Sequence, residues 1–102
     1  MAKKKRIVFK GAYKHSILTD DLEHCFFCGR EPIQFHHIFG GSDRDKATED
    51  DMVVPLCWNC HQKLHTEHSQ RTRYKLMRAA QWAYEETHTR DEFRKRYGKS
   101  YL

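Results

Sequence analysis

The pattern of apolar and polar positions divides the middle of the chain into two strand-like runs followed by a helical one. β-Branched and aromatic residues from Ile33 to Phe39 predict a strand, and the apolar run from Met52 to Leu56 predicts a second strand that ends near Pro55. Residues 40–46 between them are polar and rich in glycine, which is typical of a loop. A helix capped by Asn59 is expected next. Strand, loop, strand and helix together predict a ββα unit.

Two further helices are predicted after this unit. From 69 to 87 the apolar residues recur at helical spacing and form one core-facing stripe, made of Leu76, Met77, Ala80, Ala83 and Tyr84. The segment Thr89–Glu92 has the form of a capping box and predicts the start of a last helix. Gly98 is expected to end this helix. Phe93 and Tyr97 lie one turn apart in it and are expected to pin this helix to the body of the protein.

The N-terminal part is less regular. Residues 1–6 form a basic tail, which is either a solubilising terminus or an arm that contacts phosphates. The alternation over 6–9 indicates a short strand. Ile17, Leu18 and Leu22 indicate either a turn of helix or an extended cover over the zinc site.

Composition narrows the class of protein. With 102 residues, 38% of them hydrophobic, the chain is expected to be one folded domain, 1–102, with a thin core. The formal net charge of +5 suits a polyanionic partner, and nucleic acid is the commonest one for a small basic domain. No apolar run approaches the ~20 residues of a membrane span, and no signal-peptide core follows the basic start. A cytoplasmic protein without a membrane partner is therefore expected.

Four cysteines occur as two C-x-x-C pairs, Cys25 with Cys28 and Cys57 with Cys60. Two residues between the thiols let both point at one metal ion, and Gly29 permits the tight turn after the first pair. In a reducing compartment, zinc-bound thiolates are favoured over two disulfides. The pairs predict one closed, structural zinc site with four cysteine ligands, which ties the ends of the ββα unit together.

Four histidines are left over beside this site. His36 and His37 are neighbours on the predicted strand and so face opposite sides of it, while His61 and His65 lie one helical turn apart. Because zinc would hold the strand against the helix, one histidine of each pair can share a divalent ion, and the other strand histidine remains available. A metal ion plus such an imidazole is suited to hydrolysis. The competing interpretation is a buried strand histidine beside an exposed one.

Taken together, these motifs resemble those of HNH endonucleases of the zinc-ribbon, ββα-metal type. The resemblance covers residues 25–68: the cysteine pairs, His36-His37-Ile38, Val53-Val54-Pro55-Leu56, His61 and His65. It is especially close to small phage and prophage members, and the ending from Arg90 to Leu102 is similar to their tails. It implies an α+β fold. A small ββα-metal core would be held together by a zinc ion bound to the four cysteines, and additional helices would follow in 69–102.

The same resemblance implies roles for the histidines. His37 would be the general base that activates water, and His36 and His61 would hold the catalytic divalent ion, Mg²⁺ or Mn²⁺ or another such ion. His65 would be a third ligand or a phosphate contact. An imidazole that titrates near ~6.5 can accept a proton from water at neutral pH, which agrees with the first role.

The chain departs from the family pattern at one position. The middle Asn, which orients the loop that carries the base, is missing, and Asp50, Asp51 and Met52 occupy that region. The Asp51 carboxylate can accept the same backbone hydrogen bonds but cannot donate as an amide does.

The leading hypothesis is therefore a divalent-metal-dependent DNA endonuclease that hydrolyses phosphodiester bonds. Arg44, Lys46 and Lys63 are candidate phosphate contacts beside the site, with plain surface charge as the alternative. A monomer would nick DNA, and a homodimer would cut both strands. The alternatives are a non-catalytic zinc-ribbon module that binds nucleic acid, which the missing Asn favours, and a zinc-site protein-interaction domain, which fits poorly with the positive charge.

Overall fold

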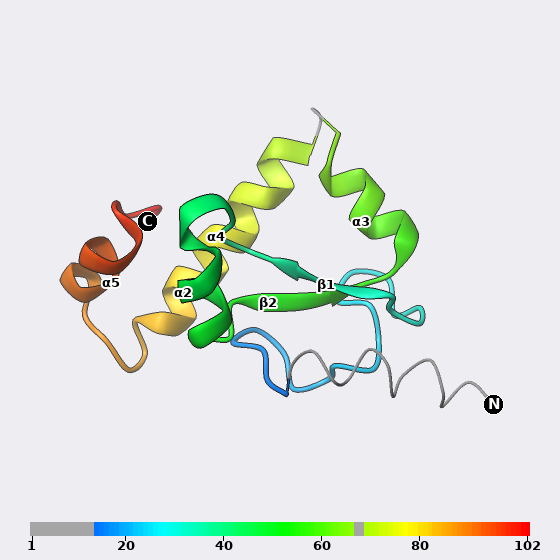
Figure 1. The fold of residues 1–102 in the computed structure, drawn as a ribbon, viewed down its shortest axis with the longest axis horizontal. Helices are drawn as coiled ribbons and strands as arrows, with labels where there is room; N and C mark the ends of the chain where they lie inside the picture. Colours follow the sequence, from blue (N-terminus) through cyan, green and yellow to red (C-terminus); the bar gives the residue numbers. More distant parts are fainter. Residues whose placement is uncertain (1–13, 67–68) are drawn as a thin grey trace.

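The computed structural model describes residues 14–66 and 69–102. The basic tail 1–6 and the expected strand over 6–9 lie outside the described residues. The fold is α+β, as predicted, and packs helices around a small antiparallel sheet (Figure 1). Its elements in chain order are β1 (Gln34–His37), the 3₁₀ turn η1 (Gly41–Asp43), α2 (Arg44–Glu49), β2 (Val53–Leu56), α3 (Trp58–Leu64), α4 (Gln70–Tyr84) and α5 (Arg90–Tyr97). No helix in these ranges is long and apolar enough to cross a membrane.

The two predicted strands pair with each other. β1 and β2 run antiparallel, with Phe35 opposite Pro55 and His36 opposite Val54. All four residues of β2 are buried. Pro55 sits at the third of the four β2 positions rather than at the strand end. Its missing N–H is tolerated because each strand of a two-stranded sheet has an unpaired edge, and its carbonyl still accepts a hydrogen bond from Phe26 N at 2.8 Å.

The expected loop over 40–46 is wrong, because most of this segment is helical. Gly41, with φ +59°, begins η1, and α2 follows directly at Arg44. Ala47 of α2 is completely buried. The polar composition of the segment gave no indication of this apolar contact. The Ala47 carbonyl also accepts a hydrogen bond from Met52 N at 2.7 Å, which closes the connection into β2. Ala47 is thus the buried residue of this short helix, and hydrogen bonds between Lys46 and α5 add to its docking.

The N-cap of α3 is Cys57 and not Asn59, so that prediction is also wrong. Cys57 has extended backbone angles, and its sulfur accepts a hydrogen bond from Cys60 N at 3.5 Å. Asn59 lies inside the first turn. A thiolate sulfur is an acceptor at the position where a Ser or Asp oxygen usually stands, so the second cysteine pair begins the helix itself.

The C-terminal helices confirm the apolar stripe and the capping box. α4 buries Leu76, Ala80 and Tyr84, whereas the other two stripe residues are half-buried. α5 begins with the predicted reciprocal cap between Thr89 and Glu92. It ends at Gly98 in the left-handed region with φ +92°, the conformation that favours glycine, and it buries Phe93 and Tyr97.

One buried polar residue of α4 was not anticipated. Gln81 is fully buried, and its amide nitrogen donates to Ser100 Oγ at 3.0 Å and to Glu85 Oε2 at 2.8 Å. Its amide oxygen accepts from Tyr101 N at 2.7 Å. These bonds satisfy both ends of the amide and hold the chain after α5 against α4.

The segment before the first cysteine pair resolves the open choice between helix and cover. Ile17 and Leu18 pack against the main core and Leu22 against Phe35, with no helix or strand between 14 and 33. Ile17 N donates to Asp51 O at 2.7 Å, which anchors the cover to the turn before β2. This segment is therefore extended, as one of the two alternatives predicted, and what it covers is the main core and the Phe35 cluster.

Candidate metal centres and histidine site

The two cysteine pairs meet at one point, as their spacing predicts. Their four Sγ atoms lie within 4.8 Å of one another, and Cys28 Sγ is 3.5 Å from Cys57 Sγ. The first pair sits on a turn closed by Gly29 N bonded to Cys25 O, with Gly29 at φ +80°. The second pair sits at the start of α3. Residues far apart in sequence therefore supply the four corners of a single sulfur cluster.

The electrostatics of the cluster favour a bound cation. Burial opposes ionisation of Cys25, but backbone N–H groups of Cys57, Cys28 and Phe27 outweigh it and lower the pKa of Cys25 to about 6. Burial, together with the neighbouring thiols, raises the pKa of Cys60 instead. The cluster thus tends to hold some negative charge and resists more of it. Four sulfur donors at these separations match a tetrahedral ion with bonds of about 2.3 Å, so the residues fit zinc.

Three histidines gather where β1 faces α3. His36 reaches from β1 toward His61 on α3, with ring centroids 6.0 Å apart. His65, which caps the end of α3, has its Nε2 atom 3.2 Å from that of His61. Gln34 Nε2 lies 2.9 Å from the same His61 nitrogen. Sequence reasoning missed Gln34, although it stands two positions before His36 and therefore on the same face of β1.

The pKa values of these rings are depressed. Burial first, and then the nearby His61 and His65 rings, lower the pKa of His36 to about 4. Burial and His65 lower the pKa of His61 as well. At neutral pH these two imidazoles are uncharged, and an uncharged imidazole nitrogen has the lone pair that a metal ion needs.

His37 points to the opposite face of β1, toward α2. Its Nε2 atom lies 3.1 Å from Thr48 Oγ1, and the Thr48 hydroxyl itself donates to Arg44 O at 3.1 Å. The threonine oxygen is therefore the acceptor of the His37 Nε2–H, which assigns the lone pair of the neutral ring to Nδ1. Burial and the Arg44 charge lower the pKa of His37, so the ring is neutral at pH 7.

Side chains of α5 bind Asp50, which lies in the region of the missing Asn. Asp50 Oδ2 accepts hydrogen bonds from Arg96 Nε at 2.6 Å and from the Tyr97 hydroxyl at 2.5 Å. Asp51 takes up a left-handed conformation with φ +60° and forms the turn into β2. Met52 O accepts from Ile38 N at 2.9 Å. The carboxylate of Asp50 thereby links the end of α2 to the last helix.

The three candidate phosphate contacts differ in their surroundings. Arg44 is exposed at the start of α2. Lys46 is engaged within the fold, because its ammonium donates to Arg96 O at 2.9 Å and lies 3.6 Å from Asp43. Lys63 is exposed and lines a cavity of about 320 Å³ together with Cys28 and Cys60 among others. Arg44 and Lys63 are thus more available to a ligand than Lys46.

Comparison with known families agrees with this geometry. Residues 24–67 match the family model described as HNH endonuclease. Neither the curated proteins nor the solved structures compared with the chain include a match to it. The matched segment contains β1, β2, α2 and α3, and both the sulfur cluster and the histidines. By this match and by the order of its strands and helix, the segment 24–67 is similar to HNH endonucleases.

Proposed function

We propose that the protein is a divalent-metal-dependent endonuclease that hydrolyses phosphodiester bonds in DNA. The observation that carries the proposal is the division of the histidines by β1: His36 faces His61 and His65 on one side, and His37 faces α2 on the other. Ligands for an ion and a base for water thus lie next to each other in the chain but are held separately. The family match of residues 24–67 supports a nuclease role.

The residues fit a catalytic ion. His36, His61 and His65 would hold the ion through up to three imidazole nitrogens, donors typical of transition-metal ions, and Mg²⁺ or Mn²⁺ would need water and phosphate oxygens as further ligands. When bound, such an ion stabilises the charge that develops on the phosphate and on the leaving oxygen. We propose that the four cysteines hold a separate structural zinc ion, which takes no part in the chemistry.

His37 is the proposed general base. The hydrogen bond from Nε2–H to Thr48 fixes the ring, so Nδ1 can take a proton from water as the water oxygen attacks phosphorus. The 3′-oxygen then leaves with the electron pair of the broken P–O bond. The depressed pKa of His37 keeps the ring ready to accept this proton at neutral pH. Arg44 and Lys63 are proposed to contact flanking phosphates.

Plasmid cleavage tests the proposal. Supercoiled plasmid is incubated with the wild type and with His37→Ala, each with Mg²⁺, with Mn²⁺ and with a chelator. We expect metal-dependent nicking or linearisation by the wild type and a loss of roughly 10²–10⁴-fold in rate for His37→Ala. His15→Ala, which alters an exposed histidine outside the site, is the matched control and should retain the wild-type rate.

Two outcomes have distinct meanings. Equal background nicking by wild type and His37→Ala in every metal would refute the enzyme proposal and favour a non-catalytic nucleic-acid-binding module, as the replaced Asn suggests. Nicked product would mean that the active species cuts one strand, as expected of a monomer. Linear product would mean that it cuts both strands, as expected of a homodimer.

A further inference from the structure

Charge is distributed unevenly along the chain. Residues 14–69, which hold both metal-type clusters, contain five lysines and arginines but ten aspartates and glutamates. Residues 70–102, which form α4, α5 and the end of the chain, contain nine and four. Residues 1–13 add five lysines and arginines and no acid. The nuclease-like segment is therefore acidic on balance, and its net charge repels a polyanion instead of attracting it.

Several cations of the C-terminal part are already used within the fold. Arg96 pairs with Asp50 and Glu49, Arg90 pairs with Glu85, and the Arg73 guanidinium donates to the Leu64 carbonyl at the end of α3. Lys95 lies 3.8 Å from Asp91. Five cations remain that no acidic side chain of the described residues pairs with, and we call them the C-terminal basic surface: Arg71, Lys75, Arg78, Arg94 and Lys99.

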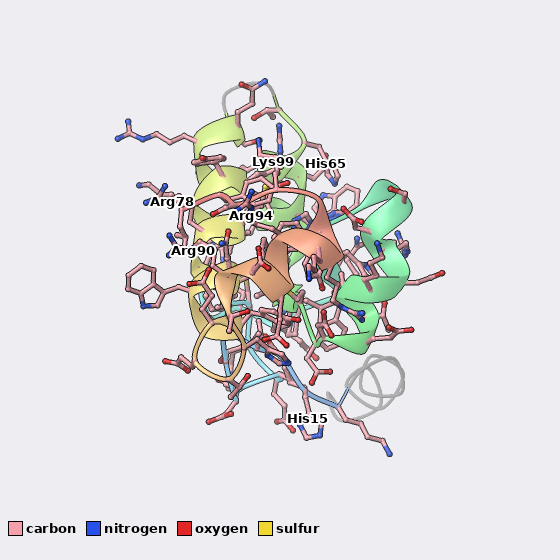
Figure 2. The ribbon with its side chains drawn as sticks, turned by 90° about the vertical axis from the view of Figure 1, so that its left-hand side faces the viewer. His15, His65, Arg78, Arg90, Arg94 and Lys99 are labelled. Carbon is pink, nitrogen blue, oxygen red and sulfur yellow. The ribbon has the colours of Figure 1, made fainter. Side chains whose placement is uncertain are left out.

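This surface has a regular geometry. Arg71, Lys75 and Arg78 recur at i, i+4 and i+7 of α4, on the side of the helix opposite to the buried stripe. Their backbone positions span about 10 Å along the helix axis. Figure 2 shows Arg78, Arg94 and Lys99 together on the face that α4 and α5 present to the viewer. The surface is thus continuous across two helices.

Aromatic residues hold two of these cations in place. Arg78 Nη1 donates to Tyr101 O at 2.9 Å, and its guanidinium lies over the Tyr74 ring at 5.8 Å. The Lys99 ammonium lies over the Tyr101 ring at 5.0 Å. Each keeps its positive charge unneutralised, because a ring face and a carbonyl carry no net charge. Less side-chain freedom is then lost when an anion binds.

The basic surface also leads toward the histidine site. The hydrogen bond from Arg73 to the Leu64 carbonyl holds the first turn of α4 against the end of α3, next to His65. The Arg71 end of the stripe is therefore the end closest to the histidines in the chain.

We propose that the C-terminal basic surface binds the phosphate backbone of duplex DNA and supplies most of the affinity that the acidic ββα segment lacks. The choice of DNA rests on the proposed function, but the binding does not require cleavage. Phosphate contacts of this kind position a duplex without reading its sequence. DNA binding and hydrolysis would then be carried by different parts of the chain.

Binding measured without added Mg²⁺ or Mn²⁺ tests this separately from cleavage. Fluorescence anisotropy of a short labelled duplex is followed over a range of salt concentrations for the wild type and for Arg71→Gln/Lys75→Gln/Arg78→Gln. Removal of three phosphate contacts should lower the slope of log K against log salt by about 2.7 and weaken binding about 500-fold near 0.1 M salt. Circular dichroism confirms that the variant is folded.

The matched control removes three exposed charges elsewhere, as Lys14→Gln/Arg30→Gln/Lys95→Gln, and should change the slope by less than about one. Equal weakening by both triple variants would show that net charge alone matters and would overturn the proposal. So would a wild type that does not bind the duplex, or one that binds duplex RNA more tightly than DNA. A wild type that binds in this way but never cleaves would refute the enzyme proposal and leave this one standing.

Discussion

The two clusters that share α3 differ in almost every physical respect. The sulfur atoms converge from two distant chain segments to within 4.8 Å, and one of them caps the helix. The histidines converge more loosely, from the β1 face and the far end of α3, with rings 4.5 and 6.0 Å apart. The sulfur cluster thus offers four donors close together, whereas the histidine rings are farther apart and come from two elements. In Figure 1 the shared helix lies on the opposite side of the sheet from α5.

We expect this difference to separate stability from chemistry on α3 and its two caps, Cys57 and His65. Loss of a cysteine should cost the fold, whereas loss of a histidine should cost the reaction and leave the fold intact. Substitutions in the two clusters and in the residues that contact them test this separation of stability from chemistry.

Cys57→Ser should abolish stable folding. The substitution removes both a donor of the sulfur cluster and the cap of α3, and structural zinc sites contribute about 10–16 kcal/mol in zinc-finger peptides, as much as or more than the total stability of a typical domain. Circular dichroism and metal analysis should show loss of helix and of about one zinc per chain. If the Cys57→Ser variant contained no zinc and still had the melting temperature of the wild type, the sulfur cluster would not stabilise the fold, and the distinction between the clusters would be lost.

Asp50→Ala should destabilise the protein by about 2–3 kcal/mol, because it leaves Arg96 and the Tyr97 hydroxyl without their shared partner. This partly buried pair connects α5 to the end of α2. Urea unfolding measures the change. Because α2 also carries Thr48, the contact of His37, cleavage should slow even at temperatures where the variant is fully folded. Tyr97→Phe, which keeps the ring, should have less effect on both.

His36 should make stability depend on pH when no ion occupies the histidine site. Its pKa falls from 6.5 when unfolded to about 4 when folded, so the unfolded chain binds more protons between these values. The contribution is complete above pH 6.5 and is lost as pH falls toward 4. The full shift corresponds to about 3 kcal/mol, and partial exposure reduces this to about 1–2 kcal/mol.

The comparison with His36→Gln isolates this contribution. Acid also releases zinc from thiolates, but it does so in both proteins. The difference in unfolding free energy between wild type and variant should therefore change between about pH 7 and about pH 4.5. A constant difference over that range would contradict the assigned environment of His36.

Thr48→Val should give the smallest effect. Thr48 is exposed, so the free energy of unfolding should change by less than about 0.5 kcal/mol. Loss of the hydrogen bond to His37 Nε2 should slow cleavage by several-fold to about tenfold, with kcat affected more than KM. Thr48→Ser, which keeps the hydroxyl, should restore the rate. An unchanged rate for Thr48→Val would mean that this contact does not orient the base.

The local patterns were predictable where a single periodicity or spacing decides the structure. Both strands, the stripe of α4 and the capping box of α5 follow from residues close together in sequence. Helix α2 was missed because it buries only one residue, Ala47, so it has no periodic apolar signal, and its other contacts are with the distant helix α5. Gln81 was missed for the opposite reason, since only the folded chain shows that Ser100 and Tyr101 satisfy its buried amide.

The sequence by itself determined the chemical groups of both clusters, because C-x-x-C spacing and the paired histidines restrict which atoms can meet. Only the tertiary structure decided how the groups are shared. Packing of β1 against α3 places His36 with His61, and the docking of α2 gives His37 a threonine partner. Packing of α5 against the end of α2 assigns Asp50 to Arg96. Such contacts join residues that lie on different elements, well beyond one helical turn or one strand repeat, so no local pattern records them.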